Sequence, residues 1–241
     1  MIGLGTIVNT AAIALGGLCG LLFGKRLGDR HQDALMKACG VSVIIIGVAG
    51  TLSKMLSVQD GSLVSGGSLL MVLSLALGAL VGETINIEGG FERFGEWLKR
   101  KTGNAKDKRF VEGFVTASLT VSIGAMAVVG AIRDGLSGDS SVLITKSILD
   151  FVIVMVMTAS LGKGCGFAAI PVLVVEGTLT LLARLIAPVM TDAALGNLSL
   201  VGSVLIFCVG LNLTFGKRIR VANLLPALIF AAAAAFLPVN L

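Results

Sequence analysis

Two acidic residues, Asp150 and Glu176, lie about ten residues inside long apolar stretches of the sequence. Lys146 precedes Asp150 by one helical turn, and Arg184 follows Glu176 by two turns. A charge near the middle of a bilayer costs about 3 kcal/mol even on insertion-based scales, so we expect these side chains to face the protein interior or a hydrated cavity. Such carboxylates are typical of ion or proton pathways, where burial and a nearby lysine tune their protonation. The alternative is a pair of internal salt bridges that join two helices, and Arg184 alone could also reach outward to the membrane surface.

A second polar group lies in the apolar stretch that begins near residue 110. Its hydroxyl side chains alternate at Thr116, Ser118, Thr120 and Ser122, and glycines follow at 124 and 130. Hydroxyls and glycines can satisfy backbone groups freed at a helix break, so the segment predicts a broken or re-entrant helix around a binding cavity. A surface of small residues for helix packing explains the same composition equally well. Glu112 opens the stretch, where it would either guard a vestibule or mark the membrane interface.

Two asparagines in later apolar stretches, Asn212 and Asn223, complete the candidate pathway residues. Asn212, and Asn9 in the first apolar stretch, are amides that need an internal partner in lipid, and such residues join helices more often than they bind ligands. Asn223 lies close to Pro226, where the two could interrupt the last helix. Prolines at positions 171, 188 and 226 would kink or interrupt the helices around them.

The sequence argues against several other classes of function. It has one histidine, His31, and lacks an H-E-x-x-H helix or a G-x-S-x-G turn, so we predict that it is not an enzyme. An aspartyl mechanism would require Asp150 and Glu176 to approach each other. The four cysteines have no paired spacing, so we expect no metal site, no disulfide framework and no cofactor. The net charge of +5 does not indicate nucleic acid as a partner, because no soluble basic domain is present to bind it.

The elements that position these residues are transmembrane helices. Hydrophobic residues make up 55% of the chain, charged residues 14%, and the mean hydropathy is +0.97. A helix needs about 20 residues to cross the hydrocarbon core. The sequence contains about eight stretches of this kind, at 4–23, 34–56, 67–86, 110–132, 141–162, 166–190, 197–215 and 222–239. We therefore predict an all-α polytopic bundle that forms a single integral membrane domain over residues 1–241, in contact with the lipid bilayer.

The loops between these stretches predict the orientation. Fifteen of the 19 Lys and Arg residues lie in every second loop, and the opposite loops hold only Lys54 and Arg133. The positive-inside rule places the basic loops in the cytoplasm. Both termini are then expected on the non-cytoplasmic side, in a multi-pass protein of the bacterial inner (plasma) membrane.

The longest basic loop contains an amphipathic segment, at about residues 88–103. Phe91, Phe94, Trp97 and Leu98 share one helical face, and acids and bases occupy the other. We expect a helix that lies in the interface of the cytoplasmic leaflet, with the single tryptophan of the chain as its anchor. The alternative is a soluble connector that packs on neighbouring loops.

Glycines at 16, 20, 24 and 28 repeat every four residues along the first stretch, and positions 78 and 82 repeat the spacing in the third. This spacing, a glycine zipper, predicts close helix packing. The packing could lie within one chain or between the subunits of a homo-oligomer.

Four segments resemble the YdfK/YqgA-type family of bacterial inner-membrane proteins. They are residues 110–119 (FVEGFVTASL), 132–139 (IRDGLSGD), 145–150 (TKSILD) and 220–228 (RVANLLPAL). The resemblance covers essentially the full chain and implies a multi-spanning membrane protein of uncharacterised function that is often taken for a transporter. The segments include Glu112, Lys146 and Asp150.

Two function hypotheses follow. The first is a transporter or channel for a small solute or ion, with the midplane carboxylates as coupling or permeation groups. The second is a structural or regulatory membrane protein, with the glycine face for assembly and the basic amphipathic helix for docking. Tightly paired carboxylates without a hydrated cavity around them would favour the second hypothesis.

Overall fold

Six helices are long and apolar enough to cross a membrane. The computed structural model describes residues 1–24, 26–59, 61–122 and 125–236. Within these, the six candidate spans are α1 (Leu4–Gly24), α2 (Asp29–Met55), α3 (Ser68–Ile85), α7 (Ser141–Leu161), α8 (Ala169–Leu181, extended by the 3-10 turn Lys163–Ala168) and α10 (Asp192–Phe215). Large apolar side chains such as Ile7, Ile45 and Leu80 lie exposed on their outer faces. Lipid-facing helices require this arrangement.

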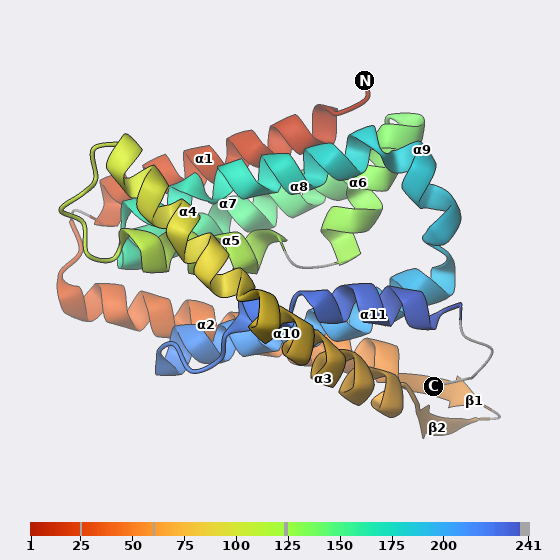
Figure 1. Cartoon of the computed structure of the whole chain (residues 1–241). Helices are drawn as coiled ribbons and strands as arrows, with labels where there is room; N and C mark the ends of the chain where they lie inside the picture. Colours follow the sequence, from red (N-terminus) through yellow and green to blue (C-terminus); the bar gives the residue numbers. More distant parts are fainter. Residues whose placement is uncertain (25, 60, 123–124, 237–241) are drawn as a thin grey trace.

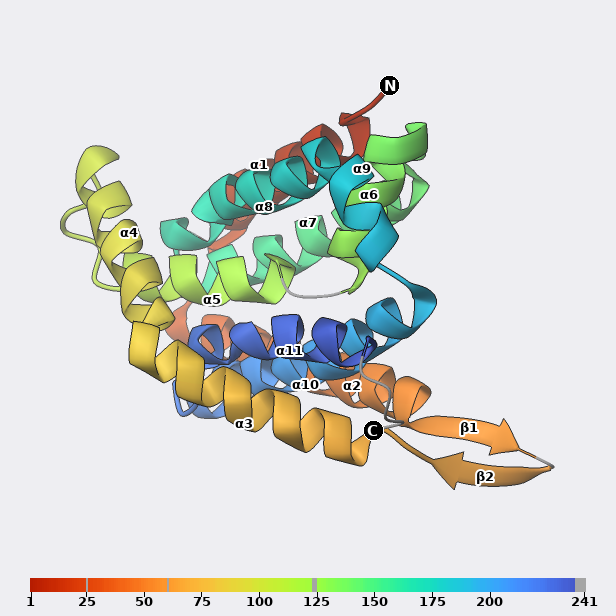
Figure 2. The same ribbon diagram turned by 45° about the vertical axis from the view of Figure 1, so that its right-hand side comes forward.

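The helices form two layers with roughly parallel long axes (Figures 1 and 2). One layer holds α1, α7, α8, α5 (Phe110–Ser122) and α6 (Ala125–Ser137). The other holds α2, α3, α10 and α11 (Pro226–Ala234). The hydrophobic core lies around Phe110, Phe114 and Leu205, which are fully buried.

The two ends of the bundle differ in charge. One end carries the α1–α2 turn, the loop 102–109, Lys163 and residues 216–220, and we call it the basic end (left in Figure 1). The other end carries the N-terminus and an antiparallel hairpin of β1 (Leu56–Gln59) and β2 (Ser62–Ser65), and we call it the hairpin end. The hairpin is an addition to the predicted all-α fold.

Glycines bring the helix backbones close together inside the chain. A Cβ on Gly16, Gly20 or Gly24 would meet the backbone of α7. Successive glycines of α1 meet successively later residues of α7, namely Phe151, Met155 and Ala159, so the two helices are parallel. Gly78 and Gly82 meet α11 and the turn before it. Gly28 lies beyond α1, directly before α2, so only three of the four predicted glycines share the α1 face. α7 of the same chain covers this face, which is the first of the two kinds of packing left open. A homo-oligomer stays a prediction.

The predicted fourth span, 110–132, is broken. α5 and α6 are inclined to each other by 62° on the two sides of residues 123–124, which lie outside the described part of the chain together with the predicted Gly124. If the bent pair counts as one span, the chain has seven candidate spans. The inclination agrees with a broken helix, as in the first of the two alternatives, whereas a binding cavity around the break stays a prediction.

Two predicted spans are shorter than the sequence indicates, so the structure supports six or seven spans instead of eight. The stretch 166–190 ends as a helix at Leu181, and the chain continues in α9 (Ala183–Ile186) and a 3-10 turn (Ala187–Val189). The stretch 222–239 contains a 3-10 turn (Val221–Leu224) and the nine-residue α11, and positions 237–239 lie outside the described residues. Pro226 at the first position of α11 sets this late start, because proline lacks the N–H that would continue the preceding turn.

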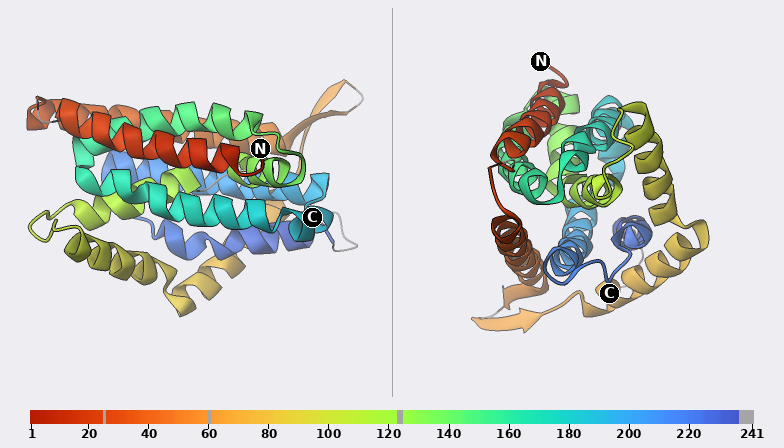
Figure 3. Two further views of the ribbon diagram at one scale, coloured as in Figure 1. Left: turned by 90° about the horizontal axis from the view of Figure 1, so that it is seen from above. Right: turned by 90° about the vertical axis from the view of Figure 1, so that its left-hand side faces the viewer.

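The amphipathic segment forms α4 (Ile87–Lys101), which crosses obliquely over one side of the bundle toward the basic end (Figures 1 and 3). Gly95 and Leu98 are buried, and the ring of Phe94 packs 5.7 Å from that of Phe114 on α5. Trp97 is half-exposed and stacks on Phe94. α4 therefore packs on the bundle through one edge of its apolar face and leaves Trp97 at the outside. That the helix lies in a membrane interface stays a prediction.

Candidate functional site

A cluster of three charged side chains lies in the centre of the first layer. Lys146 forms an ion pair with Asp150, one turn along α7. Its Nζ also lies 3.5 Å from Oε1 of Glu176 on α8. The three residues are 6%, 5% and 1% exposed, so the cluster is removed from water and from lipid. It joins α7 to α8, as the salt-bridge alternative requires.

Asn9 on α1 completes the coordination of Glu176. Its Nδ2 donates to both carboxylate oxygens, at 2.9 and 3.1 Å. One turn toward the hairpin end, the hydroxyls of Thr6 and Thr180 lie 3.1 Å apart. A polar seam therefore runs between α1 and α8, where three of these four residues are almost fully buried and Thr180 is 5% exposed.

The charged cluster also contacts the helix break. Lys146 Nζ donates to the carbonyl oxygen of Val121 at 2.7 Å. Val121 belongs to the last turn of α5 that the structure describes, and this helix ends at Ser122. An ammonium group near the C-terminal end of a helix interacts favourably with its carbonyl groups and with the negative end of the helix dipole. Lys146 thus connects the break in α5 to both carboxylates.

The hydroxyl residues of α5 differ in their contacts. Thr120 donates to the Thr116 carbonyl at 2.7 Å, within the helix. The buried Oγ atoms of Ser118 and Ser122 and Oδ1 of Asn9 have no hydrogen-bond partner among the described residues. Buried oxygens without a donor are uncommon in folded proteins, because each one costs about 1–3 kcal/mol.

A cavity of about 360 Å³ opens between the two layers at the basic end. Three predicted site residues line it, namely Glu112, Thr116 and Asn212. Its deeper wall is apolar and consists of Val115, Leu119, Leu161, Val209 and Leu213. Asp150, Glu176 and Lys146 do not line this cavity. The cavity and the charged cluster therefore share two helices: α5, whose Leu119 lies two residues before Val121, and α7, whose last residue Leu161 lines the cavity.

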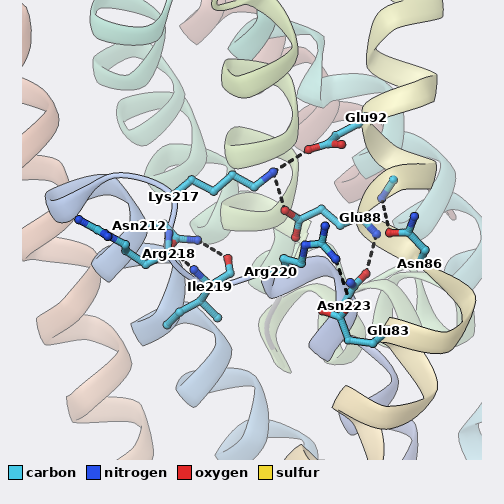
Figure 4. Close-up of polar contacts among 11 residues, drawn as sticks. Glu83, Asn86, Glu88, Glu92, Asn212, Lys217, Arg218, Ile219, Arg220 and Asn223 are labelled. Atoms are coloured by element: carbon cyan, nitrogen blue, oxygen red, sulfur yellow. Dashed lines mark hydrogen bonds and ion pairs between the residues drawn. The ribbon is translucent and has the colours of Figure 1, made fainter.

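An ion-pair network borders the cavity where α4 meets the loop after α10 (Figure 4). Lys217 Nζ lies 2.7 Å from Oε1 of Glu88 and 2.6 Å from Oε1 of Glu92. Arg220 pairs with Glu83 at 3.0 Å, outside the cavity. Partial burial alone would lower the pKa of Lys217, but its hydrogen bonds to Glu88 and Glu92 outweigh this effect and raise the pKa above its ordinary value. Lys217 is therefore a cation throughout the physiological range.

The two candidate asparagines serve this same region. Asn212 Oδ1 accepts from the backbone N–H groups of Arg218 and Ile219 at 2.9 Å, and its Nδ2 donates to the Ile219 carbonyl at 2.7 Å. Asn223 Oδ1 accepts from the N–H of Glu88 at 2.7 Å, which ties the start of α4 to the turn before α11. Both residues hold the loop that presents Lys217 (Figure 4).

Arg184 does not belong to either group of residues. It lies exposed on α9 at the hairpin end, so the placement of this residue inside a span is wrong. The physical reason is that α8 ends at Leu181, so the candidate span ends three residues before Arg184. At the same end, buried Asp134 accepts from the N–H of Gly5 at 3.0 Å and stabilises the start of α1.

Sequence reasoning missed several residues of these two groups. The Val121 carbonyl carries no side-chain signal, and Asn9 gave only the general expectation of an internal partner. Glu88 and Glu92 belong to the polar face of an amphipathic helix, where acids are normally solvated. The signal that could have found Glu88 is its position one residue after the start of α4, where the chain leaves the membrane helix α3.

The comparisons with known proteins agree with this architecture. The family model described as "Protein of unknown function (DUF554)" matches residues 4–236. The uncharacterized protein YqgA of Escherichia coli (strain K12) is 31% identical over 232 residues, which cover 95% of this chain and 94% of the relative. The uncharacterized membrane protein YdfK of Bacillus subtilis (strain 168) is 29% identical over 225 residues, which cover 93% and 92%. No solved structure matches the chain. With six long apolar helices and a relative that is named a membrane protein, the chain is a multi-pass membrane protein.

Proposed function

The chain belongs to the DUF554 family of proteins of unknown function, and we propose that it is a transporter or channel for a small solute or ion in the bacterial inner membrane. In this proposal the carboxylates of Asp150 and Glu176 are the coupling groups, and the chain is not an enzyme. The observation that carries the proposal is the charged cluster at the break in α5. Its ammonium pairs with two carboxylates and also contacts the last described turn of α5, in the middle of a membrane bundle.

The charge of the cluster supports a coupling role. With all three groups ionised, it has one more negative than positive charge, and the described residues bring no second cation to it. An uncompensated charge in a low-dielectric interior is costly. One proton or one monovalent cation would neutralise the cluster. The net charge of the cluster therefore depends on binding of an ion that a transmembrane gradient can supply.

The geometry of α5 supports a route to this cluster. The cavity at the basic end follows α5 from Glu112 through Thr116 to Leu119. Two residues further on, the Val121 carbonyl contacts Lys146. Broken helices whose ends contact the bound ion are a recurrent device of membrane transporters.

We also propose that the basic end faces the cytoplasm. Lys and Arg residues of four separate segments gather there, and the positive-inside rule assigns such loops to the cytoplasmic side. The N-terminus and the hairpin then lie outside.

Flux measurements on purified protein in liposomes test the transport proposal. The parent protein, Asp150→Asn and Glu176→Gln are compared under an imposed proton or sodium gradient, with a trapped pH dye and labelled small solutes as readouts. Asp150→Asn leaves Lys146 and Glu176 as a balanced pair, so we expect a folded protein without coupled flux. Lys163→Met, at an exposed position of the basic end, is the control and should retain the flux. If the parent moves neither protons nor any tested solute, the transport proposal fails.

One observation favours the structural alternative, in which the cluster only fastens helices together. Lys146 already has three oxygen partners, from α5, α7 and α8. On this alternative, Asp150→Asn and Glu176→Gln would lower the thermal stability, and the parent protein would show no flux.

A further inference from the structure

The cavity at the basic end has the chemistry of a binding site for an amine. Its polar rim contains Glu88, Glu92 and Glu112, and its only basic lining residue in the described part of the chain is Lys217. The site therefore has two more negative than positive charges. Its inner wall is apolar, with Val115, Leu119 and Val209 buried.

Glu88 is the residue that sets this cavity apart from a solvated acidic surface. It is 3% exposed, it lines the cavity, and its Oε2 has no hydrogen-bond partner among the described residues. A buried carboxylate oxygen without a donor is costly, and a ligand that donates a hydrogen bond there would remove this cost. The ligand group must be a donor and, because of the excess negative charge, a cation.

Lys217 indicates what this group looks like. Its ammonium lies between Glu88 and Glu92, at 2.7 and 2.6 Å from one oxygen of each (Figure 4). It extends from a loop, and its side chain is 49% exposed. The site thus already holds an alkylammonium that belongs to the chain and is free on its outer side to move away.

We propose that this cavity binds an amphipathic organic amine, whose ammonium takes the place of Lys217 between Glu88 and Glu92 and whose apolar body lies along Val115, Leu119 and Val209. Lys217 is then a tethered competitor that keeps the carboxylates paired while the site is free. That this amine is the transported solute rests on the proposed function, whereas the binding itself does not.

Hexylammonium is a suitable probe, with hexanol as its uncharged analogue. Binding to the protein in nanodiscs is measured by titration calorimetry, and empty nanodiscs give the partition into lipid. We expect saturable binding of hexylammonium, and no binding of hexanol beyond the lipid blank. Equal signals for the two compounds would overturn the proposal without the use of any variant.

Three variants assign the binding to this site. Glu88→Gln should weaken binding about tenfold, which is the loss expected for a charged hydrogen bond. Lys217→Met should strengthen it, because the competitor is gone. Glu83→Gln breaks the neighbouring pair with Arg220 outside the cavity and should leave it unchanged. Unchanged binding in both Glu88→Gln and Lys217→Met would also overturn the proposal. Binding is measured without a gradient, so it is independent of flux. Hexylammonium binding to a protein that shows no flux would refute the transport function and retain the amine site. Flux in a protein that does not bind hexylammonium would refute the amine site and retain the transport function.

Discussion

Lys146 is the residue on which the charged cluster depends. It is the single cation beside Asp150 and Glu176 in the described part of the chain, and it also satisfies the Val121 carbonyl at the end of α5. One side chain therefore compensates two buried carboxylates and a helix terminus. No other position of the cluster has a comparable number of partners.

Replacement of Lys146 by methionine should therefore destabilise the protein strongly. Breaking a buried ion pair on one side costs about 3–5 kcal/mol, since the remaining charge must either stay uncompensated or take up a proton. Thermal unfolding in detergent or lipid would measure the loss. Lys163→Met, at an exposed site, should stay within about 0.5 kcal/mol of the parent. Equal stability of the two variants would mean that the cluster is not compensated by Lys146.

At the residue scale, the sequence identified candidate site residues where a charged side chain lies within an apolar stretch. Asp150, Glu176 and Lys146 stand out because a charge in an apolar stretch must have a reason, and the structure buries and pairs all three. Their role in a pathway stays a prediction. The Val121 carbonyl could not be found, because every residue has a carbonyl and only the position of the helix end makes this one available. Glu88 has only its position at the start of α4 to distinguish it from its solvated neighbours, because its burial depends on where α4 packs.

Among the elements, α1 and α7 approach each other so closely that their contact requires glycine. A Cβ on Gly20 would meet the Met155 carbonyl and the Thr158 side chain, so one helix must shift to admit it. Gly177 on α8 has open space at the same position. The two glycines form a matched pair for a test.

Gly20→Ala should lower the stability by about 1–3 kcal/mol, the usual cost of overpacking. Gly177→Ala should leave it unchanged or raise it by about 0.5–1 kcal/mol, because alanine is the better helix former. Both are measured by thermal unfolding under the same conditions. A stable Gly20→Ala protein would show that the α1–α7 contact is looser than the structure has it.

The helices themselves were predictable to the extent that an apolar run determines them. The five stretches around α1, α2, α3, α7 and α10 agree with the structure to within about five residues at each end. Hydropathy alone did not predict where α8 and α5 end, because residues 182–190 and 123–132 are as apolar as the helices before them. For α5, the hydroxyls and glycines indicated a break as one of two alternatives. Hydropathy records whether a residue tolerates lipid, but a bend depends on the neighbours that receive the freed backbone groups, here Lys146 on a different helix. The β hairpin escaped prediction because its eight strand residues are too few for a clear alternation.

For the whole molecule, the decisive question is which end faces the cytoplasm. The packing of the bundle does not determine its orientation in the membrane, since its layers pack in the same way in either orientation. The charges do distinguish the two ends, because nine of the 19 Lys and Arg residues lie in the segments that define the basic end, and six more lie on α4 and near the start of α2. Orientation is therefore a property of the loops, and loop positions are where it has to be tested.

Cysteines introduced at exposed positions of the two ends provide the measurement. Ser62→Cys lies in β2 at the hairpin end, and Lys106→Cys lies in the loop before α5 at the basic end. With a membrane-impermeant maleimide on intact cells, we expect Ser62→Cys to be labelled and Lys106→Cys to be labelled only after permeabilisation, because the positive-inside rule retains the basic loops. The parent protein, with Cys165 buried and three partly buried cysteines, gives the background. The reverse labelling pattern would show that the basic end faces the outside of the cell. The cavity with Glu88 and Lys217 would then receive its ligand from outside, and any transport would begin on that side.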